Sequence, residues 1–123
     1  MNKETLLNRT KQFSICIISL VESMPETRTA RIIGNQLIRS GTSVGANYRA
    51  ANRAKSCRDF INKLKIVEEE LDETLYWFDL LEESKIISLS DLKALKNEAN
   101  ELLAIFISAI KTTRKNILAN KNS

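Results

Sequence analysis

The residues of this 123-residue chain best suited to chemistry are cations that gather in one segment. Between positions 28 and 65 there are nine arginines and lysines and a single acid, Asp59, so this segment carries a charge of +8. The next segment, 66 to 83, holds eight acids and no base. A segregated basic patch is the electrostatic footprint of a nucleic-acid binder, because the planar guanidinium group matches the geometry of phosphate. We predict phosphate contacts from five of the cations: Arg49, Arg53, Lys55, Arg58 and Lys63.

Two other interpretations of the basic segment stay open. Its cations could pair with the acidic face of a neighbouring helix or of another subunit, or they could form a solvated surface. Tyr48 could add a face on which bases stack. Cations that contact phosphate position a protein without reading sequence, so the pattern predicts RNA or DNA without choosing between them.

The chain offers few groups for catalysis. It has no histidine, which excludes Ser-His-Asp and Cys-His catalysis and any histidine-containing zinc site. The consecutive glutamates Glu68, Glu69 and Glu70 fan around a helix, which favours a solvated face over a metal site. The glycines do not form the phosphate-binding loop of nucleotide enzymes. We therefore expect no enzymatic activity, no cofactor and no metal.

The hydrophobic pattern repeats at alternating steps of three and four residues, which predicts helices. Pro25 separates the first two, and Ser56 can cap a third. We expect helices over about 3–23, 27–53, 57–83 and 89–117, with a polar tail after Leu118. Short connections make neighbouring helices antiparallel, so the predicted fold is all-α: a single domain, 1–123, with an up-down-up-down four-helix bundle. Without an apolar run long enough for a bilayer or a signal peptide, we expect a cytoplasmic protein with no membrane contact.

The second predicted helix contains many residues that are poor helix formers. Gly34, Gly41 and Gly45 share one face, which predicts close approach of a neighbouring backbone. Ser40 and Asn47 fall on its apolar stripe, where they would bond backbone carbonyls or each other, since an unpaired buried polar group is costly. We interpret this stretch as a close helix–helix contact with a polar layer that fixes the register.

Several predicted helices are apolar on more than one stripe. A lone four-helix bundle needs one apolar stripe per helix, so the surplus predicts a second buried surface and self-association. The alternative is a wide core with a few exposed apolar side chains. The candidate residues for a subunit interface are Ile18, Trp77, Leu103, Ile107 and Ile110.

The middle of the chain resembles a known family. Residues 40 to 81 read SGTSVGANYRAANRAKSCRDFINKLKIVEEELDETLYWFDLL, with Thr-Ser-aliphatic, Asn, basic residues and then a Ser before an aromatic. This pattern resembles the four helix bundle proteins, also called the 23S ribosomal RNA intervening-sequence protein family. Its structural signature falls here on Gly41, Ser43 and Asn47. One departure is Ala50, where the family usually has an acid; an arginine that such an acid would pair with is then freer.

The resemblance implies an up-down four-helix bundle that assembles as a ring-like homopentamer and has no enzymatic activity. It also implies a relation to the accessory variability determinant of diversity-generating retroelements, whose ring resembles a basic platform for nucleic acid and a reverse transcriptase. We therefore expect a non-catalytic nucleic-acid-binding scaffold, with a reverse transcriptase as a candidate partner. The alternative is a protein–protein interaction adaptor without direct nucleic-acid contact, in which an acidic partner surface would dock on the same arginines or Trp77 would anchor the interface.

Overall fold

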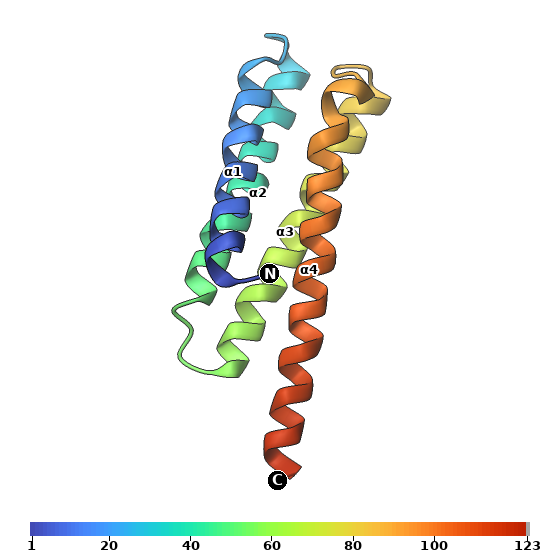
Figure 1. Cartoon of the computed structure of the whole chain (residues 1–123). Coiled ribbons are helices and arrows are strands. Elements are labelled where there is room, and N and C mark those ends of the chain that lie inside the picture. Colours follow the sequence, from blue (N-terminus) through green and yellow to red (C-terminus); the bar gives the residue numbers. More distant parts are fainter. Residues whose placement is uncertain (123) are drawn as a thin grey trace.

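The protein is all-helical, as predicted. The structure, a computed structural model, describes the backbone of residues 1–122 and the side chains of residues 1–120. Within this range the chain forms four helices and no strand (Figure 1): α1 (Lys3–Glu22), α2 (Arg28–Ala51), α3 (Cys57–Glu83) and α4 (Leu89–Asn122).

Local capping explains where the first three helices begin. The side chains of Asn2, Thr27 and Ser56 accept hydrogen bonds from the backbone N–H two or three positions into α1, α2 and α3. Such caps satisfy N–H groups that have no partner inside the helix. Each connection is only a few residues long, and Figure 1 shows each helix running back along the one before it. At the α3–α4 connection, Lys85 takes a φ of 63°, the left-handed conformation that reverses the chain there.

The fourth helix is longer than predicted. We expected it to end at about 117 in a polar tail, but it continues to Asn122. Neither glycine nor proline occurs after Gly45, so nothing in this segment stops a helix that has already formed. As a result, the end of α4 projects beyond the α2–α3 connection (Figure 1).

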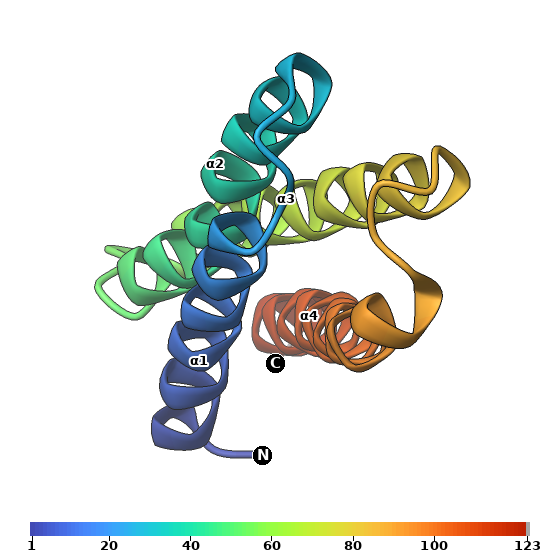
Figure 2. The same ribbon diagram turned by 90° about the horizontal axis from the view of Figure 1, so that it is seen from above.

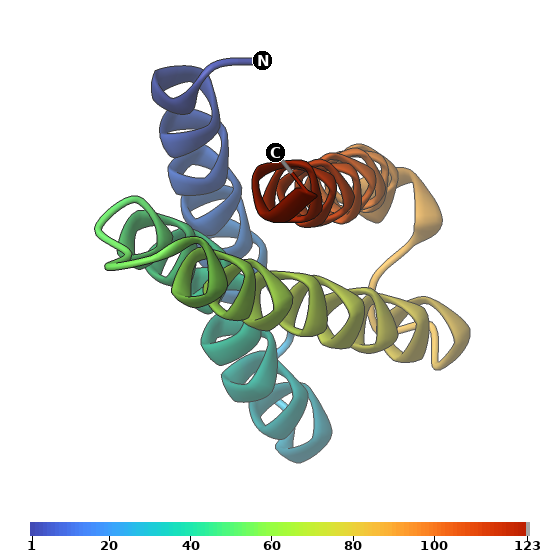
Figure 3. The same ribbon diagram turned by 90° about the horizontal axis from the view of Figure 1, so that it is seen from below.

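The helices pack mainly in chain order. α1 packs on α2, α2 on α3 and α3 on α4, whereas α1 and α4 meet only weakly. Seen from above, α1 and α2 lie against each other along part of their length (Figure 2), and from below α4 stands nearly end-on between α1 and α3 (Figure 3). The core that joins them is fully buried and includes Phe13, Ile17, Leu37, Phe78 and Phe106.

The small residues of α2 bring α1 close. A Cβ atom added to Gly41 would lie 2.9 Å from Cγ1 of Ile17, closer than carbon atoms pack. Ser14 of α1 also donates a hydrogen bond to the Gly41 carbonyl across the interface (3.4 Å). The close helix–helix contact expected from the glycines is therefore made by α1 and α2.

The polar layer differs in part from the expectation. Ser40 is buried as expected, and its hydroxyl bonds that of Thr74 on α3 at 2.8 Å. Asn47, by contrast, is only half-buried and donates to the Ser43 carbonyl of its own helix (2.8 Å). The buried position belongs to Tyr48, which lies four residues after Val44 and three before Ala51 on the buried face of α2 and packs against Phe106 of α4.

Among the helices of residues 1–122, none is long and apolar enough to cross a membrane.

Candidate nucleic-acid interface

Five cations gather where α2 ends and α3 begins. Arg49, Arg53, Lys55 and Arg58 are exposed and Lys63 is half-buried. We call these five residues the basic end. Ion pairs within 4 Å in the described part of the chain involve Arg9, Arg39 and Lys96 as cations, so none of the basic end has a carboxylate partner there.

The connection that carries the basic end is held by its own backbone. The N–H groups of Arg53 and Ala54 donate to the carbonyls of Ala50 and Ala51, each at 3.0 Å. These bonds close the last turn of α2 and fix the path of the following residues.

The one acid of the segment is used in the cap of α3. Ser56 Oγ accepts from the N–H of Asp59 (3.1 Å), and Asp59 Oδ2 accepts from the backbone N–H of Lys55 (3.2 Å). This arrangement resembles a capping box with the acid bonded one residue earlier. Asp59 thus orders the connection instead of pairing with an arginine side chain.

The charge order of α3 runs against helix stability. A helix dipole favours anions near the N-terminus and cations near the C-terminus, each by about 0.3–1 kcal/mol. In α3, the first turn carries both Arg58 and Asp59, whereas the last turn carries Glu82 and Glu83 and no basic residue, so the unfavourable charges are those of the last turn. The stability of α3 therefore does not explain why these charges are placed as they are.

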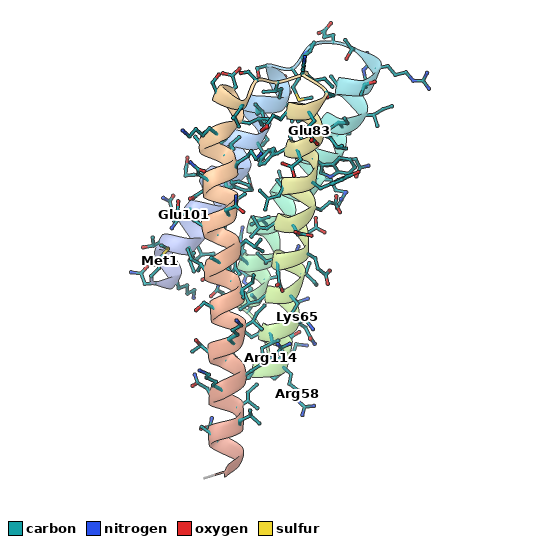
Figure 4. All side chains as sticks on the ribbon, turned by 90° about the vertical axis from the view of Figure 1, so that its right-hand side faces the viewer. Met1, Arg58, Lys65, Glu83, Glu101 and Arg114 are labelled. Carbon is teal, nitrogen blue, oxygen red and sulfur yellow. The ribbon has the colours of Figure 1, made fainter. Side chains whose placement is uncertain are left out.

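Helix α4 adds cations that the sequence analysis missed. Lys111 and Arg114 line a hollow between α3 and α4 together with Lys65 and one acid, Glu68. Ile107 and Ile110 complete its lining. Figure 4 shows Lys65, Arg114 and Arg58 along the same edge of the molecule, with Glu83 at the far end. More than forty positions separate Lys65 from Lys111, so only the packing of α4 on α3 reveals the group.

The basic segment as a whole does not form one patch. Arg39 pairs with two glutamates of α3, Glu70 (3.2 Å) and Glu73, so here the interpretation of pairing with a neighbouring helix is correct. Arg28 and Arg31 lie in the first turn of α2, at the opposite end of the molecule from the basic end.

Tyr48 does not provide a stacking face. It is 5% exposed, and its ring centroid lies 5.2 Å from that of Phe106 on α4. Burial raises the pKa of its phenol above the usual range, and a hydrogen bond with Asn52 offsets part of that rise. The expectation failed because Tyr48, rather than Asn47, faces the core.

The candidate interface residues divide into three kinds. Ile18 is 43% exposed, Trp77 and Leu103 are half-buried against the core, and Ile107 is half-buried. Ile110 is 4% exposed and belongs to the core of the subunit, so little of its side chain is available to a partner. It faces inward because α4 rests on α3 at this level. Trp77 also donates through Nε1 to Glu73 (3.0 Å), which fixes its ring beside the Arg39 pair.

The fold and its charges define a class: an all-helical protein of four helices with a cluster of unpaired cations at one end. The model of the 23S rRNA-intervening sequence protein family matches residues 3–108, and the chain belongs to that family. A crystal structure of a protein of unknown function, from the S23 ribosomal protein family of Bacteroides thetaiotaomicron VPI-5482, is 34% identical with a TM-score of 0.84. The match covers 90% of this chain and 99% of that one. No curated protein matches the chain.

Proposed function

We propose that this protein is a non-catalytic nucleic-acid-binding scaffold that acts in the cytoplasm. The observation that carries the proposal is the basic end, where five cations from two helices and their connection lack carboxylate partners in the described structure. Elsewhere in the same molecule, Arg9, Arg39 and Lys96 are each paired across helices. Among the described residues, the chain thus pairs some cations across helices and leaves the five of the basic end without a carboxylate partner. What distinguishes the basic end from other unpaired cations, such as Arg28 and Arg31, is that five of them gather in 15 residues.

Phosphate groups suit such a surface for a physical reason. Each phosphate that a lysine or arginine neutralises releases a condensed counterion, and this release drives binding at low salt. Arg53 and Lys55 lie in a connection whose backbone is already ordered by hydrogen bonds. Less conformational entropy is then lost on binding than for cations on a disordered loop.

We also propose that the scaffold is a ring-like homo-oligomer, a homopentamer by family resemblance, built from antiparallel up-down-up-down subunits. Apolar side chains on the outer faces of three helices support self-association: Ile15 and Ile18 on α1, Ile32 on α2, and Ile66 and Tyr76 on α3 are 37–56% exposed. A ring would present several basic ends to one nucleic acid and raise avidity without new contacts. Light scattering that returned the mass of one subunit would contradict this part.

The direct test is binding at fixed salt. Wild type is compared with Arg49→Ala/Arg53→Ala/Arg58→Ala by fluorescence anisotropy on a structured RNA and on duplex DNA at 50 mM salt. A matched control removes the same charge at the opposite end of the molecule, where Arg28, Arg31 and Lys93 are exposed and also lack carboxylate partners among the described residues.

The proposal expects the first variant to bind at least about tenfold more weakly than the control, because three phosphate contacts are lost. Equal affinities of the two variants would mean that only net charge matters, and the basic end would not be the site.

A second candidate function is a protein-interaction adaptor, for example for a reverse transcriptase. It is favoured by Tyr76, which is 56% exposed beside Trp77 with ring centroids 5.3 Å apart, in the acidic half of α3. Exposed tyrosines and tryptophans are common anchors of protein interfaces. A stoichiometric protein partner that is captured after nuclease treatment, and lost in Tyr76→Ala, would favour the adaptor.

A further inference from the structure

The last part of α4, residues 111–122, begins beside α3, and its end projects beyond the α2–α3 connection (Figure 1). At 1.5 Å per residue this α4 arm is about 18 Å long. Its sequence contains four bases and no acid. Ile117, near its middle, packs against the core cluster, so the arm is anchored to the bundle.

The cations of the α4 arm are placed where they repel one another. Lys111 lies three residues before Arg114 and four before Lys115, spacings at which like charges destabilise a helix. Across the hollow, α3 adds a third cation, Lys65, and one acid, Glu68, so the charged residues that line the hollow are three cations and one carboxylate. The helix dipole does not explain them, since its effect is confined to the last turn and these residues lie earlier. An anion that binds here would relieve this repulsion.

The exposure of the aromatic side chains indicates whether the ligand is a single strand or a duplex. Proteins that bind single strands without sequence preference stack bases on exposed aromatic side chains. Of the seven aromatic residues, all within the described part of the chain, only Tyr76 is exposed, and it lies among the acids of α3. At the basic end the aromatic residue is Phe60, which is half-buried against the core and lines a hollow with Lys55. The basic end and the α4 arm therefore have charge for phosphates but no fully exposed aromatic side chain on which bases could stack.

We propose that the α4 arm binds double-stranded DNA, with the helix lying in the major groove and its cations on the flanking phosphates. This proposal rests on the proposed function and deepens it. A helix fits the major groove of B-form DNA, which is about 12 Å wide, whereas the deep, narrow major groove of A-form RNA does not admit it. Thr112 and Asn116 are exposed on the arm and can hydrogen-bond base edges.

The test compares Lys111→Ala/Arg114→Ala/Lys115→Ala with the opposite-end control on three probes of one sequence. The probes are a 20-base-pair DNA duplex, the corresponding RNA duplex and the single DNA strand. We expect the arm variant to lose at least about tenfold in affinity for duplex DNA at 100 mM salt, with a salt slope shallower by about 2–3. On duplex RNA and on the single strand it should bind within about threefold of the control.

Three results would overturn the arm proposal, and they separate it from the proposed function. If the arm variant binds duplex DNA like the control while Arg49→Ala/Arg53→Ala/Arg58→Ala loses affinity, the arm is not a binding site and the basic end remains one. If the arm variant loses the same affinity for all three probes, binding in the major groove is refuted, because phosphate contact alone would explain the losses. If wild type binds none of the probes, both the arm proposal and the proposed nucleic-acid-binding function are wrong.

Two controls keep the result interpretable. Circular dichroism checks that the arm variant keeps its helix content, and a Lys111→Gln/Arg114→Gln/Lys115→Gln variant removes the charge while retaining long side chains that favour a helix. If the arm instead packed on a second copy of the chain, either variant would lower the mass measured by light scattering, and the DNA assignment would be wrong.

Discussion

Replacement of Gly41 by alanine tests how closely α1 and α2 approach. In an exposed helix interior, glycine to alanine stabilises by about 1 kcal/mol. At Gly41 the new Cβ would lie 2.9, 3.1 and 3.3 Å from three atoms of the Ile17 side chain. Ile17 is 0% exposed and branched at Cβ, so it has no free space into which it can rotate.

The magnitude follows from these two opposing effects. Overpacking a buried contact costs about 1–3 kcal/mol, which exceeds the gain of about 1 kcal/mol in helix propensity. We therefore expect Gly41→Ala to lower the free energy of unfolding by about 1 kcal/mol, with an upper limit near 2. Gly34→Ala is the matched control. Gly34 is buried, and its Cβ would meet Val21 at 3.1 Å and the flexible end of Met24 at 3.8 Å, two half-buried side chains that have room to shift.

The assay is equilibrium unfolding in urea followed by circular dichroism, at one protein concentration for all variants. A double-mutant cycle with Ile17→Ala adds a direct readout. Because the smaller side chain makes room for the new methyl group, Gly41→Ala should be harmless or stabilising in that background. If Gly41→Ala stabilised the wild-type chain as much as Gly34→Ala does, the close packing described for α1 and α2 would be wrong.

Three further predictions concern buried and paired groups. Thr74→Val should lower the free energy of unfolding by about 1–3 kcal/mol, because it leaves the buried Ser40 hydroxyl with only a long contact to the Leu37 carbonyl. Adding Ser40→Ala to the same chain should restore part of the lost stability, since no buried hydroxyl is then left unpaired. Burial raises the pKa of Tyr48, so the folded chain keeps a proton that the unfolded chain releases near pH 10, and stability should fall as pH rises above about 10. In Tyr48→Phe, urea unfolding between pH 9 and 11.5 should show a shallower fall; an unchanged profile would contradict the burial of Tyr48. Glu98→Gln removes the charge of the ion pair with Arg9 that joins α1 to α4, and it should cost about 1 kcal/mol or less at low salt, with the loss shrinking in 1 M salt.

Periodicity was sufficient to place the helices. The stripe that contains Phe13 and Ile17, and the later one that contains Leu64 and Phe78, are buried in the structure. Pro25 and Ser56 mark the first two connections because their effects on the backbone are local. Properties that depend on neighbouring residues in the chain can be read from the sequence.

Contacts between helices were harder to predict. Asn47 and Tyr48 are adjacent, and periodicity alone does not decide which of them faces the core. Tyr48 does so because Phe106 of α4, 58 positions later in the chain, packs against its ring. Ile110 was assigned to an outer surface for the same reason: the wide apolar face of α4 does not show which part lies against α3.

The candidate site was predictable only in part. A count of charges finds the cations around Arg53 but cannot show that Arg39 is neutralised by α3, because that pairing depends on the rotation of two helices. Nor can it show that Lys111 and Arg114 lie near Lys65. Packing thus removes one arginine from the basic surface and adds cations from α4.

The measurement that tests the central claim most directly is the dependence of binding on salt. Affinity for a structured RNA or duplex DNA is measured between 50 and 200 mM salt for wild type, for Arg49→Ala/Arg53→Ala/Arg58→Ala and for the control that removes charge at the opposite end. With a slope of about −0.9 per phosphate contact on duplex DNA, loss of three contacts should make the variant's slope shallower by about 2.7. Over this fourfold range in salt, wild type should then lose about 40-fold more affinity than the variant. Parallel slopes for wild type and the variant would show that the basic end does not contact phosphate, and the account of its function would be wrong.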